Sequence, residues 1–109
     1  MGLDANERLQ FGDFELDIRA GQLCRDGRPV KIQPQPLRVL SALLERPGEI
    51  VSREDLLERV WGYDVFPSTR TVDNFILRLR KRFERDPANP VHFLTVWGVG
   101  YRFLIEEGI

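Results

Sequence analysis

The sequence has little of what a metal site, a disulfide framework or a redox centre requires. Cys24 and His92 are the sole residues of their kinds, so no internal disulfide can form and no His/Cys cluster can hold zinc. No apolar run approaches the ~20 residues of a membrane span, and Met1–Gln10 has no apolar signal-peptide core. A lone cysteine is typical of a reducing compartment. We therefore expect a cytoplasmic protein without metal, cofactor or membrane contact.

The length and composition predict one folded domain. The chain has 109 residues, of which 42% are hydrophobic and 30% charged, a balance typical of a globular protein with a single core. Residues 1–10 are polar, with two isolated leucines, and are interpreted as a terminal or linker segment. The domain is expected over residues 11–105.

The first part of this domain predicts a small antiparallel sheet. Residues 12–18 alternate, with Phe14, Leu16 and Ile18 on one face and acidic residues on the other, as in a half-buried strand. Asp26-Gly27 then separates two short apolar runs. Asp-Gly favours a type I′ hairpin turn, because both central residues of that turn have positive φ.

Two helices are predicted next. The first opens at Pro34-Gln35-Pro36, carries leucines at helical spacing and stops at Pro47-Gly48. The second begins after Ser52, in a sequence that resembles a capping box with Asp55 in the usual Glu position. Gly62 is expected to end it.

A third helix and a hairpin complete the domain. Ser68 or Thr69 can cap the helix, which is expected to run to about Phe83. Residues 93–97 and 101–105 read as strands around a Gly-Val-Gly turn. The fold class is therefore α+β: a small antiparallel sheet, a three-helix core and a C-terminal β-hairpin.

The third helix concentrates positive charge. Residues 70–85 hold six basic and two acidic residues, a net charge of +4, whereas the rest of the chain holds ten basic and fifteen acidic residues, a net charge of −5. The whole-chain charge of −1 therefore hides a basic segment, the electrostatic footprint of a nucleic-acid-binding protein.

The two faces of this helix differ in chemistry. At about 100° per residue, one stripe is apolar and is predicted to be buried: Val72, Ile76, Leu79 and Phe83. The opposite side gathers Arg70, Asn74, Leu77, Arg78, Lys81 and Arg85. Arg80 and Arg82 flank the stripe. Asparagine can read adenine edges and an exposed leucine can meet a thymine methyl group, so this face suits the major groove.

The elements around the helix support that interpretation. A short helix, a connection and a longer basic helix form a helix-turn-helix, and the following hairpin would be its wing. Thr95, Trp97, Tyr101 and Arg102 on the hairpin are available for phosphate or minor-groove contacts. The alternative for these four is strand packing or, for Arg102, simple solvation. Both alternatives are open at this point.

Five segments resemble one known family in order and spacing. They are residues 47–53 (PGEIVSR), 56–64 (LLERVWGYD), 70–76 (RTVDNFI), 79–81 (LRK) and 95–103 (TVWGVGYRF). Together they resemble the winged helix-turn-helix DNA-binding domains of OmpR/PhoB-type response regulators. The resemblance extends over roughly Phe11 to Phe103.

The resemblance implies a function and its residues. It implies a four-stranded N-terminal sheet, recognition of double-stranded promoter DNA as a tandem dimer on direct repeats, and a place in two-component transcription regulation. Most relatives carry a receiver domain before this one. By position, Arg70, Arg78 and Arg80 match basic residues on or beside the recognition helix, and Thr95 and Tyr101 match wing positions that can touch the DNA backbone.

The resemblance also implies a second contact and shows departures. The loop 62–69, with Tyr63, Asp64 and Phe66, would touch RNA polymerase. Phe75 stands where many members have histidine, Leu77 where many have arginine, and Trp97 where a wing arginine often enters the minor groove. The base sequence that is recognised and the contribution of the wing therefore differ from those of many relatives.

Two other classes of function fit the sequence less well. A winged-helix protein-interaction module without DNA binding could use Leu77 and Trp97 as an apolar patch, but it would not require a helix so cationic. An enzyme is not expected. His92 is interpreted as a partly exposed or satisfied loop residue, and Cys24 as a small apolar filler without a base. The Gly-Val-Gly turn lacks the strand–helix setting of a phosphate-binding loop.

Overall fold

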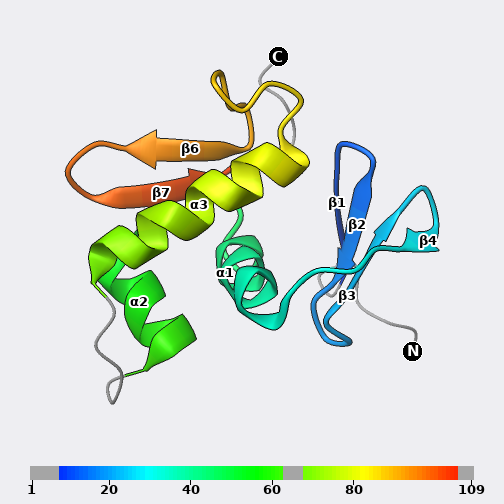
Figure 1. Cartoon of the computed structure of the whole chain (residues 1–109), viewed down its shortest axis with the longest axis horizontal. Coiled ribbons are helices and arrows are strands. Elements are labelled where there is room, and N and C mark those ends of the chain that lie inside the picture. Colours follow the sequence, from blue (N-terminus) through cyan, green and yellow to red (C-terminus); the bar gives the residue numbers. More distant parts are fainter. Residues whose placement is uncertain (1–7, 63–67, 106–109) are drawn as a thin grey trace.

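The computed structural model describes residues 8–62 and 68–105. Its elements follow the order strands, helix, strand, two helices, hairpin (Figure 1). The strands are β1 (Arg8–Phe11), β2 (Phe14–Asp17), β3 (Gln22–Arg25), β4 (Arg28–Pro29), β5 (Ile50–Ser52), β6 (Phe93–Val96) and β7 (Gly100–Phe103). The helices are α1 (Pro34–Leu44), α2 (Arg53–Trp61) and α3 (Thr69–Phe83). Figure 1 shows α3 running alongside the β6–β7 hairpin, with the N-terminal sheet at the far end of the molecule.

The N-terminal sheet has four antiparallel strands in the order β1-β2-β3-β4. Asp26 and Gly27 have φ values of 52° and 80°, which confirms the predicted positive-φ turn between β3 and β4. The sheet begins at Arg8, inside the segment 1–10 that was expected to be a terminus. The sequence of β1 shows little hydrophobic alternation, because β1 is an edge strand in which Phe11 alone is buried.

The helix ends follow local chemistry. Pro34 and Pro36 lie in the first turn of α1, where a missing N–H costs nothing. Ser52 caps α2, since its Oγ accepts a hydrogen bond from the Asp55 amide at 3.0 Å. The reciprocal half of the predicted capping box is absent among the described contacts, where the Asp55 carboxylate faces Arg46 and Arg59 instead.

A second sheet pairs the β6–β7 hairpin with β5, the strand directly before α2. Its order is β5-β7-β6, all antiparallel. The sequence did not predict β5, which is three residues long and pairs with a strand about fifty residues later. This sheet places the hairpin beside the helix-turn-helix and confirms the predicted α+β winged helix-turn-helix arrangement.

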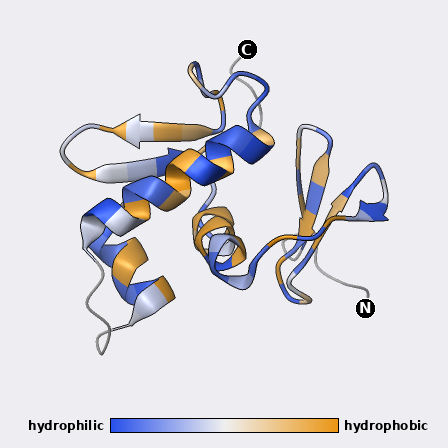
Figure 2. Cartoon of the chain, in the orientation of Figure 1, coloured by the Kyte–Doolittle hydropathy of each residue, from blue (hydrophilic) through white to orange (hydrophobic). Residues whose placement is uncertain are grey.

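One core connects these elements apart from β4, whose two residues are both exposed. The α3 stripe that was predicted to be buried is buried at all four positions, and Figure 2 shows hydrophobic and hydrophilic bands alternating along that helix. At the end of α3, the Phe11 ring lies 5.6 Å from Phe83, 5.7 Å from His92 and 5.1 Å from Phe103 between ring centroids. These aromatic contacts join the N-terminal sheet to α3 and to the hairpin.

The described residues show neither a membrane span nor a metal site. Across 8–62 and 68–105, no helix is both long and apolar enough to cross a bilayer. The same residues contain no group of three or more His, Cys, Asp or Glu side chains that could hold an ion. His92 is buried, with its Nδ1 atom 2.7 Å from the Leu104 carbonyl oxygen, as expected of a satisfied loop residue.

Candidate nucleic-acid interface

The outward side of α3 carries the residues that were predicted to meet DNA. Five of them are exposed on the helix: Arg70, Asn74, Leu77, Arg78 and Lys81. Arg85 is also exposed, two residues past the end of α3. Leu77 keeps 52% of its surface accessible, although leucine on a helix is ordinarily turned inward. The Arg78 guanidinium lies 5.0 Å from the Phe75 ring centroid, a cation–π contact that leaves its hydrogen-bond donors available.

The basic residues of this face are not neutralised by neighbours. Within the described parts of the chain, Arg70, Lys81 and Arg85 form no hydrogen bond or ion pair, and Arg78 forms none beyond its ring contact. Lys81 and its neighbours also lie in the last turn of α3, where positive charge is favoured by the helix dipole. The face therefore presents uncompensated positive charge to a ligand.

The two acidic residues of the basic segment are both turned away from this face. The Glu84 carboxylate is 6% exposed and accepts three backbone hydrogen bonds, from Val91 at 3.1 Å, His92 at 2.8 Å and Phe93 at 2.7 Å. Asp73 binds Arg53 and Tyr101. Because both carboxylates have internal partners, the fully exposed charged side chains of α3 are all basic.

Asp73 joins three elements at one carboxylate. Its Oδ1 atom accepts hydrogen bonds from Arg53 Nε at 3.0 Å and from the Tyr101 hydroxyl at 2.6 Å, and its Oδ2 atom accepts one from Arg53 Nη2 at 2.5 Å. The pairing with Asp73 raises the pKa of Arg53. Burial, followed by the hydrogen bond to Asp73, raises the pKa of Tyr101 to about 12, so its hydroxyl remains a donor at neutral pH.

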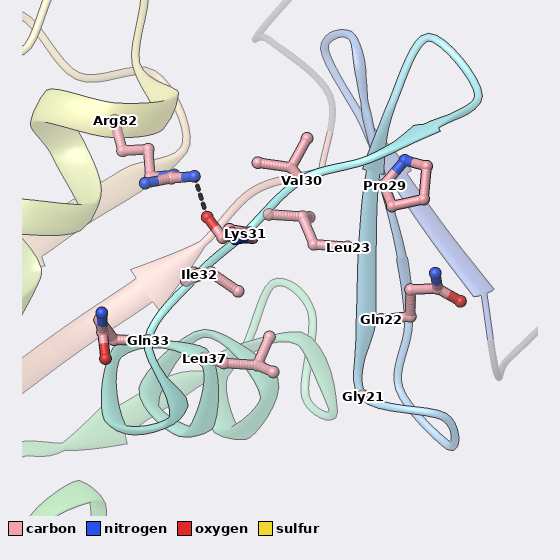
Figure 3. Close-up of a pocket in the computed structure, with 10 residues that line it drawn as sticks. All are labelled: Gly21, Gln22, Leu23, Pro29, Val30, Lys31, Ile32, Gln33, Leu37 and Arg82. Carbon is pink, nitrogen blue, oxygen red and sulfur yellow. Dashed lines mark hydrogen bonds between the residues drawn. The ribbon is translucent and has the colours of Figure 1, made fainter.

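Two other arginines of the basic segment have internal partners. Arg80 donates to the Phe93 carbonyl oxygen from Nε at 3.0 Å and from Nη2 at 2.7 Å, and Nη2 also donates to Thr95 Oγ1 at 2.8 Å. Arg82 donates to the Lys31 carbonyl oxygen, at the edge of a hollow of about 550 Å³ between the N-terminal sheet and α1 (Figure 3). Both arginines therefore hold α3 against neighbouring segments.

The hairpin presents an apolar tip. Trp97 is 89% exposed and Val99 is 47% exposed, in a turn closed by a hydrogen bond from the Val99 amide to the Val96 carbonyl oxygen. Gly98 has φ of 79°, a conformation that glycine adopts without strain. The tip therefore offers a large aromatic surface and no positive charge of its own.

The predicted hairpin residues divide into two groups. Trp97 is free at the tip, whereas Tyr101 is 7% exposed and Thr95 accepts the bond from Arg80. Arg102 is half-buried, and its Nε atom has no hydrogen-bond partner among the described residues. The predicted loop residues Tyr63, Asp64 and Phe66 lie outside the described part of the chain.

Known proteins share the fold in which these residues are arranged. A family model described as "Transcriptional regulatory protein, C terminal" matches residues 27–103. The chain belongs to the OmpR/PhoB family. It has the fold of the effector domains of these transcription regulators, in the strand, helix and hairpin order described above.

Individual OmpR/PhoB relatives are similar over nearly the whole chain. The DNA-binding response regulator MtrA of Mycolicibacterium smegmatis is 42% identical over 96 residues, which are 88% of this chain and 42% of that protein. The chain spans less than half the length of the curated relatives that it matches. Response regulator DrrB, an OmpR/PhoB homologue of Thermotoga maritima, superposes with a TM-score of 0.78 at 35% identity, over 90% of this chain and 44% of DrrB.

One OmpR/PhoB structure was solved with its binding site. The RstA DNA-binding domain of Klebsiella pneumoniae, in complex with the RstA box, superposes with a TM-score of 0.74 at 30% identity, over 90% of this chain and 97% of that domain.

Sequence reasoning missed two residues that organise this OmpR/PhoB site. Asp73 and Arg53 lie twenty positions apart, and nothing in their spacing predicts the pair. A signal was nevertheless present, because Asp73 is a lone acid in the middle of a basic helix. An acid on a face that binds an anionic ligand would repel that ligand, so a lone acid in a basic helix is a candidate for an internal partner.

Proposed function

We propose that this chain binds double-stranded promoter DNA in a sequence-specific manner, as the output domain of a two-component response regulator in the bacterial cytoplasm. In this proposal, α3 lies in the major groove and the β6–β7 hairpin is the wing on the backbone or minor groove. The observation that carries the proposal is the exposed face of α3, where unpaired basic side chains flank Asn74 and Leu77.

The exposed residues have separable roles in this proposal. Arg70, Arg78, Lys81 and Arg85 bind phosphates or guanine edges, Asn74 reads adenine, and Leu77 packs on a thymine methyl group. Trp97 contacts the DNA at the wing. Arg80, Thr95 and Tyr101 contribute through the position of the wing, since Arg80 Nε and Nη2, Thr95 Oγ1 and the Tyr101 hydroxyl already have internal partners.

Two partners complete the proposal. A tandem dimer would form on direct repeats, and the loop with Tyr63, Asp64 and Phe66 would contact RNA polymerase. Both rest on the resemblance to the OmpR/PhoB family, and neither is needed for the DNA-binding test below.

The test is the salt dependence of DNA binding. The probe is a labelled duplex selected by the unmodified chain from a random-sequence pool. Arg78→Ala and Lys81→Ala should each weaken binding and lower the slope of log K against log salt by about 0.9 for every phosphate that the removed side chain neutralises. Arg28→Ala is the matched control, because Arg28 is an exposed arginine on the N-terminal sheet. It should leave the slope unchanged.

A second measurement addresses sequence recognition. Repeating the selection with Leu77→Ala should return a changed base preference at one or two positions, while affinity for an unrelated duplex stays the same. Equal slopes for all variants, or partner binding that survives high salt and ignores DNA, would instead favour a protein-interaction module.

A further inference from the structure

The recognition helix is attached to the wing at two places on one side. Near its start, Asp73 accepts a hydrogen bond from the Tyr101 hydroxyl on β7. Near its end, Arg80 donates to the Phe93 carbonyl oxygen on β6. The two positions are seven residues apart, which is two helical turns or about 10.5 Å along the axis. Two attachments at this separation fix the direction of the hairpin relative to α3, and not only its distance.

Tyr101 contacts both of the α3 residues that make these attachments. Its hydroxyl binds Asp73, and the Arg80 guanidinium lies 5.9 Å from its ring centroid. Arg53, which completes the Asp73 group, also donates its backbone amide to the Val99 carbonyl oxygen at 3.3 Å. The turn that carries Trp97 is therefore tied to Arg53 and Asp73 from its β7 side, through Val99 and Tyr101.

The ion pair between Arg53 and Asp73 is better suited to positioning the wing than to stabilising the fold. The Arg53 and Asp73 side chains are 37% and 33% exposed, and ion pairs at such sites add little to folding free energy because water screens them. A wing that is held in place before DNA arrives, in contrast, avoids the entropy cost of ordering on binding. The group of Arg53, Asp73 and Tyr101 is therefore expected to contribute more to DNA affinity than to the free energy of folding.

We propose that Asp73 is a positioning residue for DNA binding, which acts through Tyr101 to hold the Trp97 tip in line with the outward face of α3. The inference rests on the proposed function. It adds that an acidic residue with no DNA contact of its own determines whether the wing and the helix engage one duplex together.

The experiment is a double-mutant cycle in DNA affinity, with the selected duplex as the probe. Trp97→Ala is measured in the unmodified chain, in Tyr101→Phe and in Asp73→Asn. Tyr101→Phe removes the hydroxyl alone and keeps the ring beside Arg80. Lys81→Ala provides the control cycle, because Lys81 lies on α3 and not on the wing.

If Asp73 positions the wing, Trp97→Ala weakens binding by about fivefold or more in the unmodified chain, as expected when a large apolar side chain packed against the DNA backbone or minor groove is removed. In Tyr101→Phe and Asp73→Asn it weakens binding by less than about twofold, because the tip is already displaced. Lys81→Ala has the same effect in all three backgrounds.

Other outcomes overturn the inference in distinguishable ways. If Trp97→Ala has the same effect in every background, or no effect in the unmodified chain, the wing is not positioned by Asp73. If the unmodified chain binds no duplex, the proposed function fails and this inference fails with it. Amide hydrogen exchange without DNA gives an independent measure: Asp73→Asn should accelerate exchange at residues 96–101 and leave β1–β3 unchanged. Unchanged exchange in the wing would also contradict the proposal.

Discussion

Gly100 on β7 lies against the backbone carbonyl of Val51 on β5. A Cβ atom at position 100 would be 2.0 Å from the Val51 oxygen and 2.8 Å from the Ser52 Cα atom. Both neighbours are backbone atoms of a paired strand, so neither can move aside without breaking the ladder. Glycine is therefore required at this position because there is no room for a Cβ atom, and not because of its backbone conformation.

Gly100→Ala is expected to lower the free energy of unfolding by about 3 kcal/mol or more, since overpacking against backbone is costly. Gly98→Ala, in the turn just before β7, is the matched control. It has open space but a φ of +79°, so it should cost about 1 kcal/mol of conformational strain. Urea unfolding of the two variants measures the difference. Equal losses would contradict the steric argument.

Arg80 and Lys81 are adjacent basic residues with opposite expected effects. Arg80→Ala removes hydrogen bonds to Phe93 and Thr95 and should destabilise the fold by about 2 kcal/mol, with the salt slope of DNA binding unchanged. Lys81→Ala should change stability by less than about 0.5 kcal/mol, and lower that slope by about 0.9. Thermal melts and salt titrations on both variants test the pair. A lower slope for Arg80→Ala would place its guanidinium on DNA.

Glu84 should be sensitive to the loss of one oxygen. Glu84→Gln keeps the size of the side chain but puts an amide NH₂ against a backbone N–H, where Oε1 and Oε2 now accept three hydrogen bonds. A cost of about 2–3 kcal/mol in unfolding free energy is expected, because hydrogen bonds to a charged acceptor are lost in a buried place. Glu58→Gln, an exposed substitution on α2, should be close to neutral. A neutral result at Glu84 would contradict its role as an anchor of the 84–93 connection.

Tyr101 should titrate later than an ordinary tyrosine. Its pKa is raised from 10.0 to about 12, chiefly by burial and then by the hydrogen bond to Asp73. Because the folded-state pKa is the higher one, this contribution to stability is complete below about pH 10 and is lost as the pH rises towards 12. Tyrosinate absorbance should show the late step in the unmodified chain and not in Tyr101→Phe. A single step near pH 10 in the folded protein would contradict the assignment.

Local sequence chemistry predicted much of the fold. Asp26-Gly27 specifies its turn by backbone conformation, Ser52 specifies a helix start, and the apolar stripe of α3 specifies the buried face of that helix. Each of these signals lies within a few residues. The strand β5 gave no signal because it is short and exists through its pairing with β7, far along the chain.

The candidate site was predictable in its charge but not in its connections. Helical spacing identified the exposed row from Arg70 to Arg85, since a helix face follows from residue order alone. It also placed Arg80 beside the buried stripe and Lys81 on the opposite side, but it could not show that Arg80 donates to the Phe93 carbonyl oxygen. That contact depends on how α3 packs on β6, which no local pattern encodes.

The aromatic contacts of Phe11 bear on where the folding unit begins. The family match starts at residue 27, yet Phe11, Phe14, Leu16 and Leu23 are all buried in the shared core. A protein shortened to residues 27–103 would leave the rings of Phe83 and Phe103 uncovered in water. Such a fragment would self-associate, because the N-terminal sheet covers the apolar surface at the end of α3 and the hairpin.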